Sequence, residues 1–266
     1  MKLEKTHIAK RYVYTTAVNY YNSNDISIKD CAIKFSIDRH NLSKWIRKNG
    51  GKTNAHGKQE IISDIFSKIN TEEKAYWLGF MYADGNVGTN CNSVSLELSI
   101  KDEAHLQKFN TFLGKSKSIR KDHFRVRCCF KDTQIYDDLI KLGCVPKKSS
   151  ILTFPDDTQI SEPLVRHFIR GYIDGDGSIY ISSDNINISV LGTMSFLNSL
   201  VERVKLPKRN LYKNNSQNLI DCYFFQYSGE NAIKLIKYLY HDCNIFLDRK
   251  YNKYLKYCRS KEKSLE

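Results

Sequence analysis

Two aspartates have surroundings that suit metal chemistry. Asp84 ends the run WLGFMYADG and Asp176 ends the run IRGYIDGDG, and a glycine follows each acid. Both runs have the composition of a buried helix, so both acids would lie at a helix C-terminus, where the helix dipole disfavours a negative charge. A divalent cation between the two carboxylates would offset that cost, because carboxylates are hard oxygen ligands. The pattern therefore predicts a Mg²⁺ site held by Asp84 and Asp176.

Small residues at helical spacing predict how the two runs meet. Gly79 lies four residues before Ala83, and Gly171 lies four before Gly175. Residues four apart share a helix face, and small side chains there let two backbones approach closely. Two such helices are expected to cross with their aspartates side by side. The following glycines, Gly85 and Gly177, are expected to adopt the left-handed turn that leads out of each helix.

One Asp-Gly after a helix is usually a turn, but here each copy opens the same series of elements. After the helix at 71–84, alternating runs at 93–100 and 123–130 predict strands, and a helix follows near 133–142. From residue 162 the series restarts, with helices at 163–174, 194–204 and 230–240 and strands at 178–183, 187–190 and 221–227. We therefore expect two repeats, 65–160 and 161–266.

The N-terminal region predicts a separate helical unit, 1–50, joined by a linker at 51–64. A first helix ends at Asn22–Asp25, Ser27 caps a second, and 39–48 forms a third. Ala32 would lie where two helices meet, and the apolar positions match the buried set of a helix-turn-helix: Cys31, Phe35, Ile37, Leu42 and Trp45. The third helix would read a DNA major groove with Arg39, His40, Asn41, Ser43, Lys44 and Arg47. A generic three-helix unit is the alternative.

Composition favours a polyanionic partner. The chain has 42 Lys and Arg against 29 Asp and Glu, a net charge of +13, which suits nucleic acid or an anionic membrane surface. No apolar run approaches the ~20 residues of a spanning helix, and the charged N-terminus lacks a secretion signal. The eight cysteines form no CxxC pair, which argues against structural zinc and suits a reducing compartment, either cytoplasmic or organellar.

The paired runs resemble the motifs of monomeric LAGLIDADG homing endonucleases, and the resemblance covers residues 65 to about 258. The second run matches closely. The first keeps Gly79, Ala83, Asp84 and Gly85 but differs elsewhere, with Tyr82 where the second run has Asp174. In the family the acid at this earlier place is not the metal ligand.

The resemblance implies an α+β fold of two pseudo-symmetric αββαββα repeats with saddle-shaped antiparallel sheets, beside the all-α N-terminal domain. It implies a monomer that cuts both strands of duplex DNA at a long, asymmetric site by Mg²⁺-dependent hydrolysis, with Mn²⁺ able to substitute, leaving short 3′ overhangs. Asp84 and Asp176 would bind the metal ions, with the carbonyls of Ala83 and Gly175 nearby.

Each repeat ends with a basic pair, in VPKKS and LDRKY. The resemblance places one lysine of each pair at the edge of the active site, so we expect Lys148 and Lys250 to stabilise phosphate charge or order water. Ordinary surface lysines are the alternative. The family often has Gln near the metal ions on the second strand, and the corresponding places look like Ser99 and Ser189.

The polar faces of the strands are the expected DNA surface, because Arg reads guanine in the major groove while Ser and Asn contact several bases. In the first repeat, one face carries Ser93, Ser95, Glu97, Ser99 and Lys101, and another carries His123, Arg125 and Arg127. In the second repeat the comparable residues are Tyr180, Ser182, Asn187, Ser189 and Tyr223. Any half-exposed antiparallel sheet would alternate in this way.

Other functions remain open. A catalytically inactive DNA- or RNA-binding regulator, or an intron maturase, could use the same fold, although loss of a motif acid would be expected and both are present. A transposase or recombinase would need a further catalytic acid or a Ser or Tyr nucleophile. The chain starts at Met and ends KEKSLE, without the terminal His-Asn of protein splicing, so a freestanding or intron-encoded enzyme is expected rather than an intein.

Overall fold

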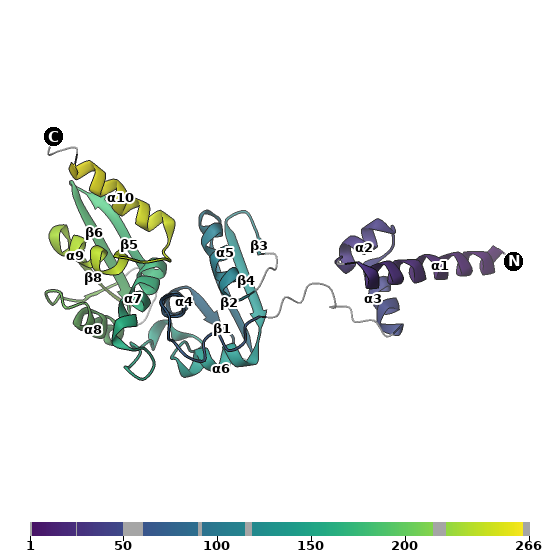
Figure 1. Ribbon diagram of the computed structural model, residues 1–266, viewed down its shortest axis with the longest axis horizontal. Coiled ribbons are helices and arrows are strands. Elements are labelled where there is room, and N and C mark those ends of the chain that lie inside the picture. Colours follow the sequence, from purple (N-terminus) through teal and green to yellow (C-terminus); the bar gives the residue numbers. More distant parts are fainter. Residues whose placement is uncertain are drawn as a thin grey trace. The chain divides into compact units, whose positions relative to one another are not determined.

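The structure is a computed structural model that describes residues 2–24, 26–49, 61–89, 92–114, 119–214 and 222–262. The chain forms two compact units, residues 1–60 and 61–266, and each is described by itself (Figure 1). Residues 51–60 of the expected linker, and Cys91, lie outside the described residues. In the described part of the chain, no helix combines the length and the hydrophobicity needed to cross a membrane.

The N-terminal unit consists of α1 (Lys2–Ser23), α2 (Ile28–Lys34) and α3 (Arg39–Lys48). Its core joins residues of α1 to residues of the two short helices: Tyr14, Ala17, Val18, Tyr21, Cys31, Ala32, Leu42 and Ile46. Helices α2 and α3 therefore contact the face of α1 that carries Tyr14, Ala17, Val18 and Tyr21. Phe35, Ile37 and Trp45 are half-buried, and Ile46 is a core residue that the pattern did not indicate.

Local hydrogen bonds explain where α2 and α3 begin. The Ser27 hydroxyl accepts the Asp30 N–H at 3.1 Å, and the Asp38 carboxylate accepts the Asn41 N–H at 2.8 Å. Such caps satisfy donors that the first helical turn leaves free. Ser36, between the helices, has a φ of 52°, a left-handed conformation that glycine adopts most easily.

The second unit contains two successive αββαββα repeats, so the expected α+β fold is confirmed. The first is α4 (Glu72–Ala83), β1 (Gly85–Val87), β2 (Ser93–Ser99), α5 (Glu103–Phe112), β3 (Arg120–Lys121), β4 (Arg125–Lys131) and α6 (Thr133–Lys141). The second is α7 (Glu162–Asp176), β5 (Gly177–Ser182), β6 (Asn185–Gly192), α8 (Met194–Arg203), β7 (Tyr212–Lys213), β8 (Tyr223–Ser228) and α9 (Gly229–Tyr240). A further helix, α10 (Asp248–Glu262), follows.

The two sheets have the same topology. Their strand orders are β1-β2-β4-β3 and β5-β6-β8-β7, and all pairs are antiparallel. The register gives a fixed reference point in each repeat, because Gly85 lies opposite Leu96 and Gly177 lies opposite Val190. Residues of the two repeats can therefore be matched strand by strand.

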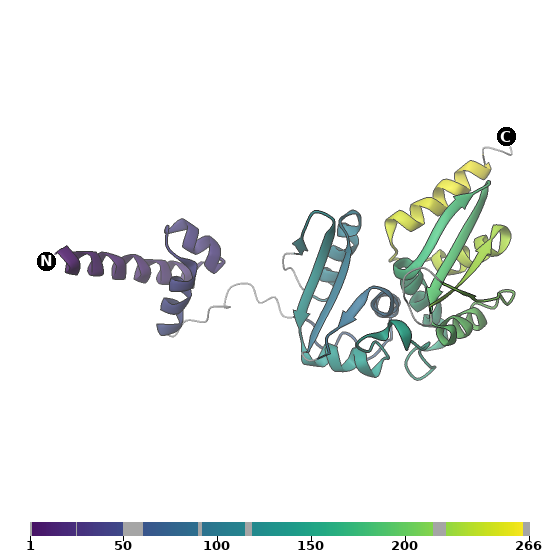
Figure 2. The same cartoon turned by 180° about the vertical axis from the view of Figure 1, so that it is seen from behind.

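One hydrophobic core runs through both repeats. Helices α5 and α6 pack on the first sheet, and α8 and α9 pack on the second. Figures 1 and 2 show α4 and α7 side by side between the two sheets. The strand residues facing the helices are fully buried and include Leu96, Val126, Ile188, Val190 and Phe225. Each sheet therefore turns one face to the core and the other face away from it.

Candidate active site

Helices α4 and α7 meet through their small residues. A Cβ atom added at Gly79 would lie 2.0 Å from the carbonyl oxygen of Phe168, and one added at Gly171 would lie 1.9 Å from that of Tyr76. No side chain fits at such distances, so the two backbones are in direct contact. The expected crossing is confirmed, and the sequence needs glycine at both positions.

The crossing brings the two acids together. Asp84 is the C-cap of α4, and Asp176 is the last residue of α7. A Cβ atom at Gly175, in the last turn of α7, would lie 2.3 Å from the Ala83 Cβ and 3.4 Å from Oδ2 of Asp84. Asp176 is half-buried, whereas Asp84 remains exposed to solvent. The acid of one repeat therefore stands beside the end of the motif helix of the other.

Burial and nearby charges change the protonation of both carboxyl groups. Loss of hydration raises the pKa of Asp176 to about 6, and the negative charge of Asp84 adds to that rise. Although Asp84 reaches solvent, the protein around it removes part of its hydration and also raises its pKa. The ammonium groups of Lys148 and Lys250 act in the opposite direction on both acids. Two carboxylates in this position repel each other until a cation is added.

The glycines after the acids differ from expectation. Gly177 has φ −87° and ψ 164°, which is extended backbone. Gly85 is likewise not among the left-handed glycines of the described chain, which are Gly114, Gly143 and Gly229. Glycine is needed here for space, because a Cβ at Gly85 or Gly177 would lie 2.5 or 2.6 Å from the carbonyl oxygen of Met81 or Ile173. The expected left-handed turn is wrong at both sites.

Lys148 and Lys250 are buried, with relative exposures of 9% and 2%. The Lys250 ammonium donates to the main-chain oxygens of Ile173 and Asp174 at 2.7 Å, to Gly175 at 3.1 Å and to Gly177. Lys148 donates to the carbonyl of Gly85. Burial excludes the reading as surface lysines and lowers the pKa of Lys250 to about 8. Both lysines place positive charge beneath the acids, at the negative ends of the motif helices.

The residues two places before the acids bind other parts of the protein. Asp174 is fully buried, and its carboxylate accepts hydrogen bonds from Tyr240 at 2.5 Å and from Tyr76 and the Leu247 N–H at 2.8 Å. Tyr82, at the matching place in α4, donates to the carbonyl of Leu142. Each residue thus ties its motif helix to the segment that precedes the buried lysine.

The donor set fits a divalent cation. The two carboxylates and the carbonyls of Ala83 and Gly175 are hard oxygen ligands of the kind that Mg²⁺ uses. The Gly175 oxygen accepts Lys250, but a carbonyl oxygen has a second lone pair. The described residues hold no cluster of three or more His, Cys, Asp or Glu side chains that could bind a metal ion, so this two-carboxylate site is the candidate centre.

The polar residues of the first sheet lie on one face. Glu97 pairs with Arg127 and Ser99 with Arg125, and paired residues point to the same side of a sheet. The expectation that the arginines share a different face is therefore wrong. Lys101 lies beyond β2, in the short 3₁₀ helix Ile100–Asp102, where strand alternation no longer applies. His123 precedes β4 and is exposed.

The register also changes which serines correspond. Ser95 pairs with Asn86, two residues after Asp84, and Ser189 pairs with Ser178, two residues after Asp176. Ser95 is therefore the counterpart of Ser189, and the assignment of Ser99 is wrong. The serine lies 11 residues after the acid in the first repeat and 13 in the second, so strand register and not sequence spacing identifies the pair. Ser95 is buried and accepts a hydrogen bond from Arg127 at 3.2 Å.

The second sheet brings together Tyr180, Ser182, Asn187 and Ser189 on its polar face. Tyr223 lies on the other side, with Phe225 and Tyr227, and packs against the core, so its expected place on the DNA surface is wrong. Gln226 is among the residues of this face that were not predicted from the sequence. It pairs with Ser189, accepts the Tyr180 hydroxyl at 3.1 Å and donates to Asn187 at 3.3 Å. The alternation in YFFQYS was the signal that could have identified it.

In the N-terminal unit, five of the expected DNA-contacting residues of α3 are exposed and Ser43 is half-buried. The exposed residues are Arg39, His40, Asn41, Lys44 and Arg47. They lie on the faces of α3 that Leu42 and Ile46 leave open. The helix therefore presents a basic surface to solvent.

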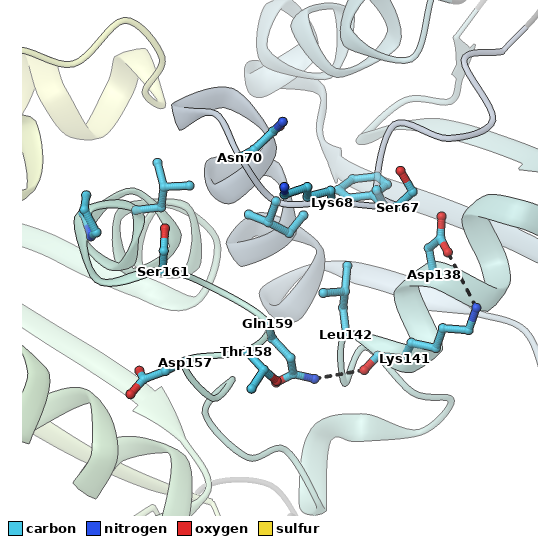
Figure 3. A pocket seen from close by; sticks show the side chains of 14 residues that line it. Ser67, Lys68, Asn70, Asp138, Lys141, Leu142, Asp157, Thr158, Gln159 and Ser161 are labelled. Carbon is cyan, nitrogen blue, oxygen red and sulfur yellow. Dashed lines mark hydrogen bonds and ion pairs between the residues drawn. The ribbon is translucent and has the colours of Figure 1, made fainter.

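A separate cavity of about 620 Å³ lies between the segment before α4, the end of α6 and the segment that leads into α7 (Figure 3). Asp138 stands near Lys141 in its wall, at 4.0 Å, and Gln159 donates to the Lys141 carbonyl at 2.9 Å. Neither motif acid lines this cavity, so it is not part of the candidate active site.

Comparisons with known proteins add the following. No protein-family model and no curated protein matches the chain. Solved structures similar to it include meganuclease I-SmaMI bound to uncleavable DNA, with 12% identity, 71% of this chain and 90% of that chain covered, and a TM-score of 0.49. LAGLIDADG meganuclease I-AabMI bound to uncleaved DNA has 13% identity, coverages of 70% and 89%, and a TM-score of 0.49. The LAGLIDADG homing endonuclease I-LtrWI bound to target DNA has 12% identity, coverages of 73% and 92%, and a TM-score of 0.46.

Proposed function

We propose that this chain is a metal-dependent endonuclease of the LAGLIDADG homing type that cuts both strands of duplex DNA at a long, asymmetric site. The observation that carries the proposal is the crossing of α4 and α7, which sets Asp84 beside the end of α7. The raised pKa of both acids marks a site that is electrostatically incomplete without a cation. A role in folding alone would not require two carboxylates there.

Bound Mg²⁺, or Mn²⁺ in its place, would activate water and neutralise charge on the scissile phosphate and the leaving oxygen. Asp84 and Asp176 would hold the ions, with the carbonyls of Ala83 and Gly175 beside them. The Lys250 ammonium is held by main-chain oxygens, so we expect it to act through the acids. Lys148 donates to one such oxygen and has three N–H donors, so it would also stabilise phosphate charge or order water. Both lysines would keep the acids ionised and fix the ends of the motif helices.

The polar faces of the two sheets would lie against the major groove, one on each half of the site. The first carries three arginines, which suits a phosphate-rich duplex. We propose that residues 1–50 form a helix-turn-helix domain whose α3 reads further base pairs to one side, and that repeats 65–160 and 161–266 act within one monomer.

The test separates cutting from binding. Duplexes that bind the full-length chain in Ca²⁺ are selected from a randomised library and then incubated with Mg²⁺. We expect the wild type to cut both strands and Asp84→Asn or Asp176→Asn to lose cutting while retaining affinity, because the amide removes charge without removing bulk. Lys121→Gln, on the helix-covered side of the first sheet, is the control. Cutting of both strands at the wild-type rate by either asparagine variant would refute the proposal.

A further inference from the structure

The two polar faces can be compared position by position. With Leu96 and Val190 as the fixed points, Glu97 of β2 matches Leu191 of β6. Across the sheet, Arg127 opposite Glu97 matches Phe224 opposite Leu191. On the edge strands, Arg120 opposite Arg127 matches Tyr212 opposite Phe224. A row of three charged residues in one repeat thus corresponds to a row of three apolar residues in the other.

Two residues of the charged row, Glu97 and Arg127, contact each other and the neighbouring Arg125. Arg125 and Arg127 flank Glu97, with N–O distances of 2.5 and 3.9 Å, and Arg127 also donates to Ser95. The two arginine side chains are nevertheless 67% and 45% exposed. A guanidinium has five N–H donors, so each can hold Glu97 and still present donors to solvent. Glu97 thereby orients the arginines and leaves them available to a ligand.

The apolar row is exposed as well. Leu191 is 36% and Tyr212 56% accessible, and the Tyr212 and Phe224 rings lie 5.7 Å apart. Next to this row, Gln226 and Ser228 line a groove of about 460 Å³ together with the segment before β7. The described strand positions on this face carry no arginine or lysine, whereas Lys208 and Arg209 of that segment line the groove.

We infer that the two faces read chemically different half-sites, the first a half rich in G·C pairs and the second a half rich in A·T pairs. The inference rests on the proposed function and names its substrate more closely. An arginine pairs with the O6 and N7 acceptors of guanine, whereas apolar side chains contact the methyl group of thymine. Each row lies next to the residue opposite Gly85 or Gly177, the glycines that follow the two motif acids. The difference in base preference should therefore begin close to the cleavage centre.

The experiment uses the full-length chain and the same selection in Ca²⁺, followed by sequencing of the bound duplexes. We expect G·C pairs to be enriched in one half and A·T pairs in the other. Arg127→Gln should reduce the preference at one G·C position by roughly tenfold to a hundredfold and leave the opposite half unchanged. Leu191→Ala should relax a thymine position in that opposite half. Lys121→Gln, which removes a charge from the other side of the first sheet, should change neither.

The outcomes distinguish this inference from the proposed nuclease. Contrasting halves in duplexes that are bound but never cut would support the inference and reject the nuclease. Cut duplexes with equal base composition in both halves, or Arg127→Gln and Leu191→Ala acting on the same half, would overturn the inference and leave the nuclease standing. Selection that enriches no duplex would overturn the inference, since the faces would then not read DNA.

Discussion

Lys148 and Lys250 stand at matching places in the two repeats, and each directs its ammonium group at the main chain around the end of its motif helix. Their contacts differ, because Lys250 reaches four carbonyl oxygens around the end of α7 and Lys148 reaches that of Gly85. The second motif helix therefore depends more heavily on its lysine.

Replacement of each lysine by methionine should reveal this difference. We expect Lys250→Met to lower the free energy of unfolding by about 3 kcal/mol and Lys148→Met by about 1 kcal/mol, since each buried acceptor left without a donor costs free energy. Urea unfolding monitored by tryptophan fluorescence measures both, because Trp77 lies in α4. Equal losses in the two variants would show that the contacts of Lys250 carry no extra stability.

The contact between α4 and α7 predicts a severe effect from one methyl group. Gly79→Ala or Gly171→Ala would press a Cβ atom against a main-chain oxygen that cannot move aside. We expect a loss of about 3 kcal/mol or more, or failure to fold, at the upper end of overpacking effects. Glu73→Ala, on the exposed side of α4, should change stability by less than about 0.5 kcal/mol. Melting temperatures compare the variants, and alanine variants as stable as wild type would contradict the crossing.

The raised pKa of Asp176 predicts how stability depends on pH without metal. The folded chain keeps this proton up to about pH 6, whereas the unfolded chain loses it near 3.8. Between these values the folded state binds more protons, so stability falls as pH rises. Asp176→Asn should remove that slope and make the metal-free protein more stable at pH 7 by about 1 kcal/mol, after allowance for solvent screening.

Divalent cations provide the complementary measurement. Mg²⁺ should raise the melting temperature of the wild type at pH 7 and have little effect on Asp176→Asn, because a bound ligand stabilises only the state that binds it. Asp137→Asn, an exposed change on α6, should behave like the wild type in both experiments. If Mg²⁺ leaves the melting temperature of the wild type unchanged, the result argues against the metal site.

The N-terminal unit predicts a measurable share of DNA affinity. Residues 1–60 contain 12 Lys and Arg and 5 Asp and Glu, a net charge of +7. Deletion of this unit should weaken binding, shorten the footprint on one flank and flatten the salt dependence, because fewer phosphates are neutralised. Cutting should persist, since both acids and both buried lysines lie in residues 61–266.

A less basic α3 serves as the matched control for the deletion. The triple variant Arg39→Gln, Lys44→Gln and Arg47→Gln keeps the N-terminal core, because Leu42 and Ile46 remain, and should reproduce part of the change in salt slope. A folded truncated protein with an unchanged footprint and an unchanged salt slope would show that the unit does not bind DNA.

The elements that carry strong local signals could be predicted from the sequence. Helix α4 begins after Thr71 and ends at Asp84 as expected, and the three N-terminal helices follow their caps and turns. The crossing of α4 and α7 was predictable too, because Gly79 and Gly171 are small residues inside apolar helices, and such residues let two backbones approach closely. In the candidate site, the pairing of Asp84 with Asp176 followed directly from these helices.

Features that depend on partners far away in the sequence were not predictable. Strand register decides which face of the first sheet Arg125 and Arg127 occupy, and it decides that Ser95 corresponds to Ser189. The local sequence pattern does not fix that register. Strand β7 has two residues, which are too few for a periodic signal. Helix α10 has a polar sequence and packs on the protein through one half-buried face. The burial of Lys250 could not be foreseen, because its partners are main-chain oxygens.

The buried pair Glu72–Arg170 makes the two repeats unsuited to partnership with copies of themselves. Arg170 is fully buried and donates to Glu72 at 2.8 Å, joining the start of α4 to the middle of α7. The positions that match them by distance from the motif acids are Leu164 and Leu78. A homodimer of the first repeat would set Glu72 against leucine, and a homodimer of the second would leave the Arg170 guanidinium without its carboxylate. Either would bury a charge without its partner, so each repeat is complementary to the other and not to a copy of itself.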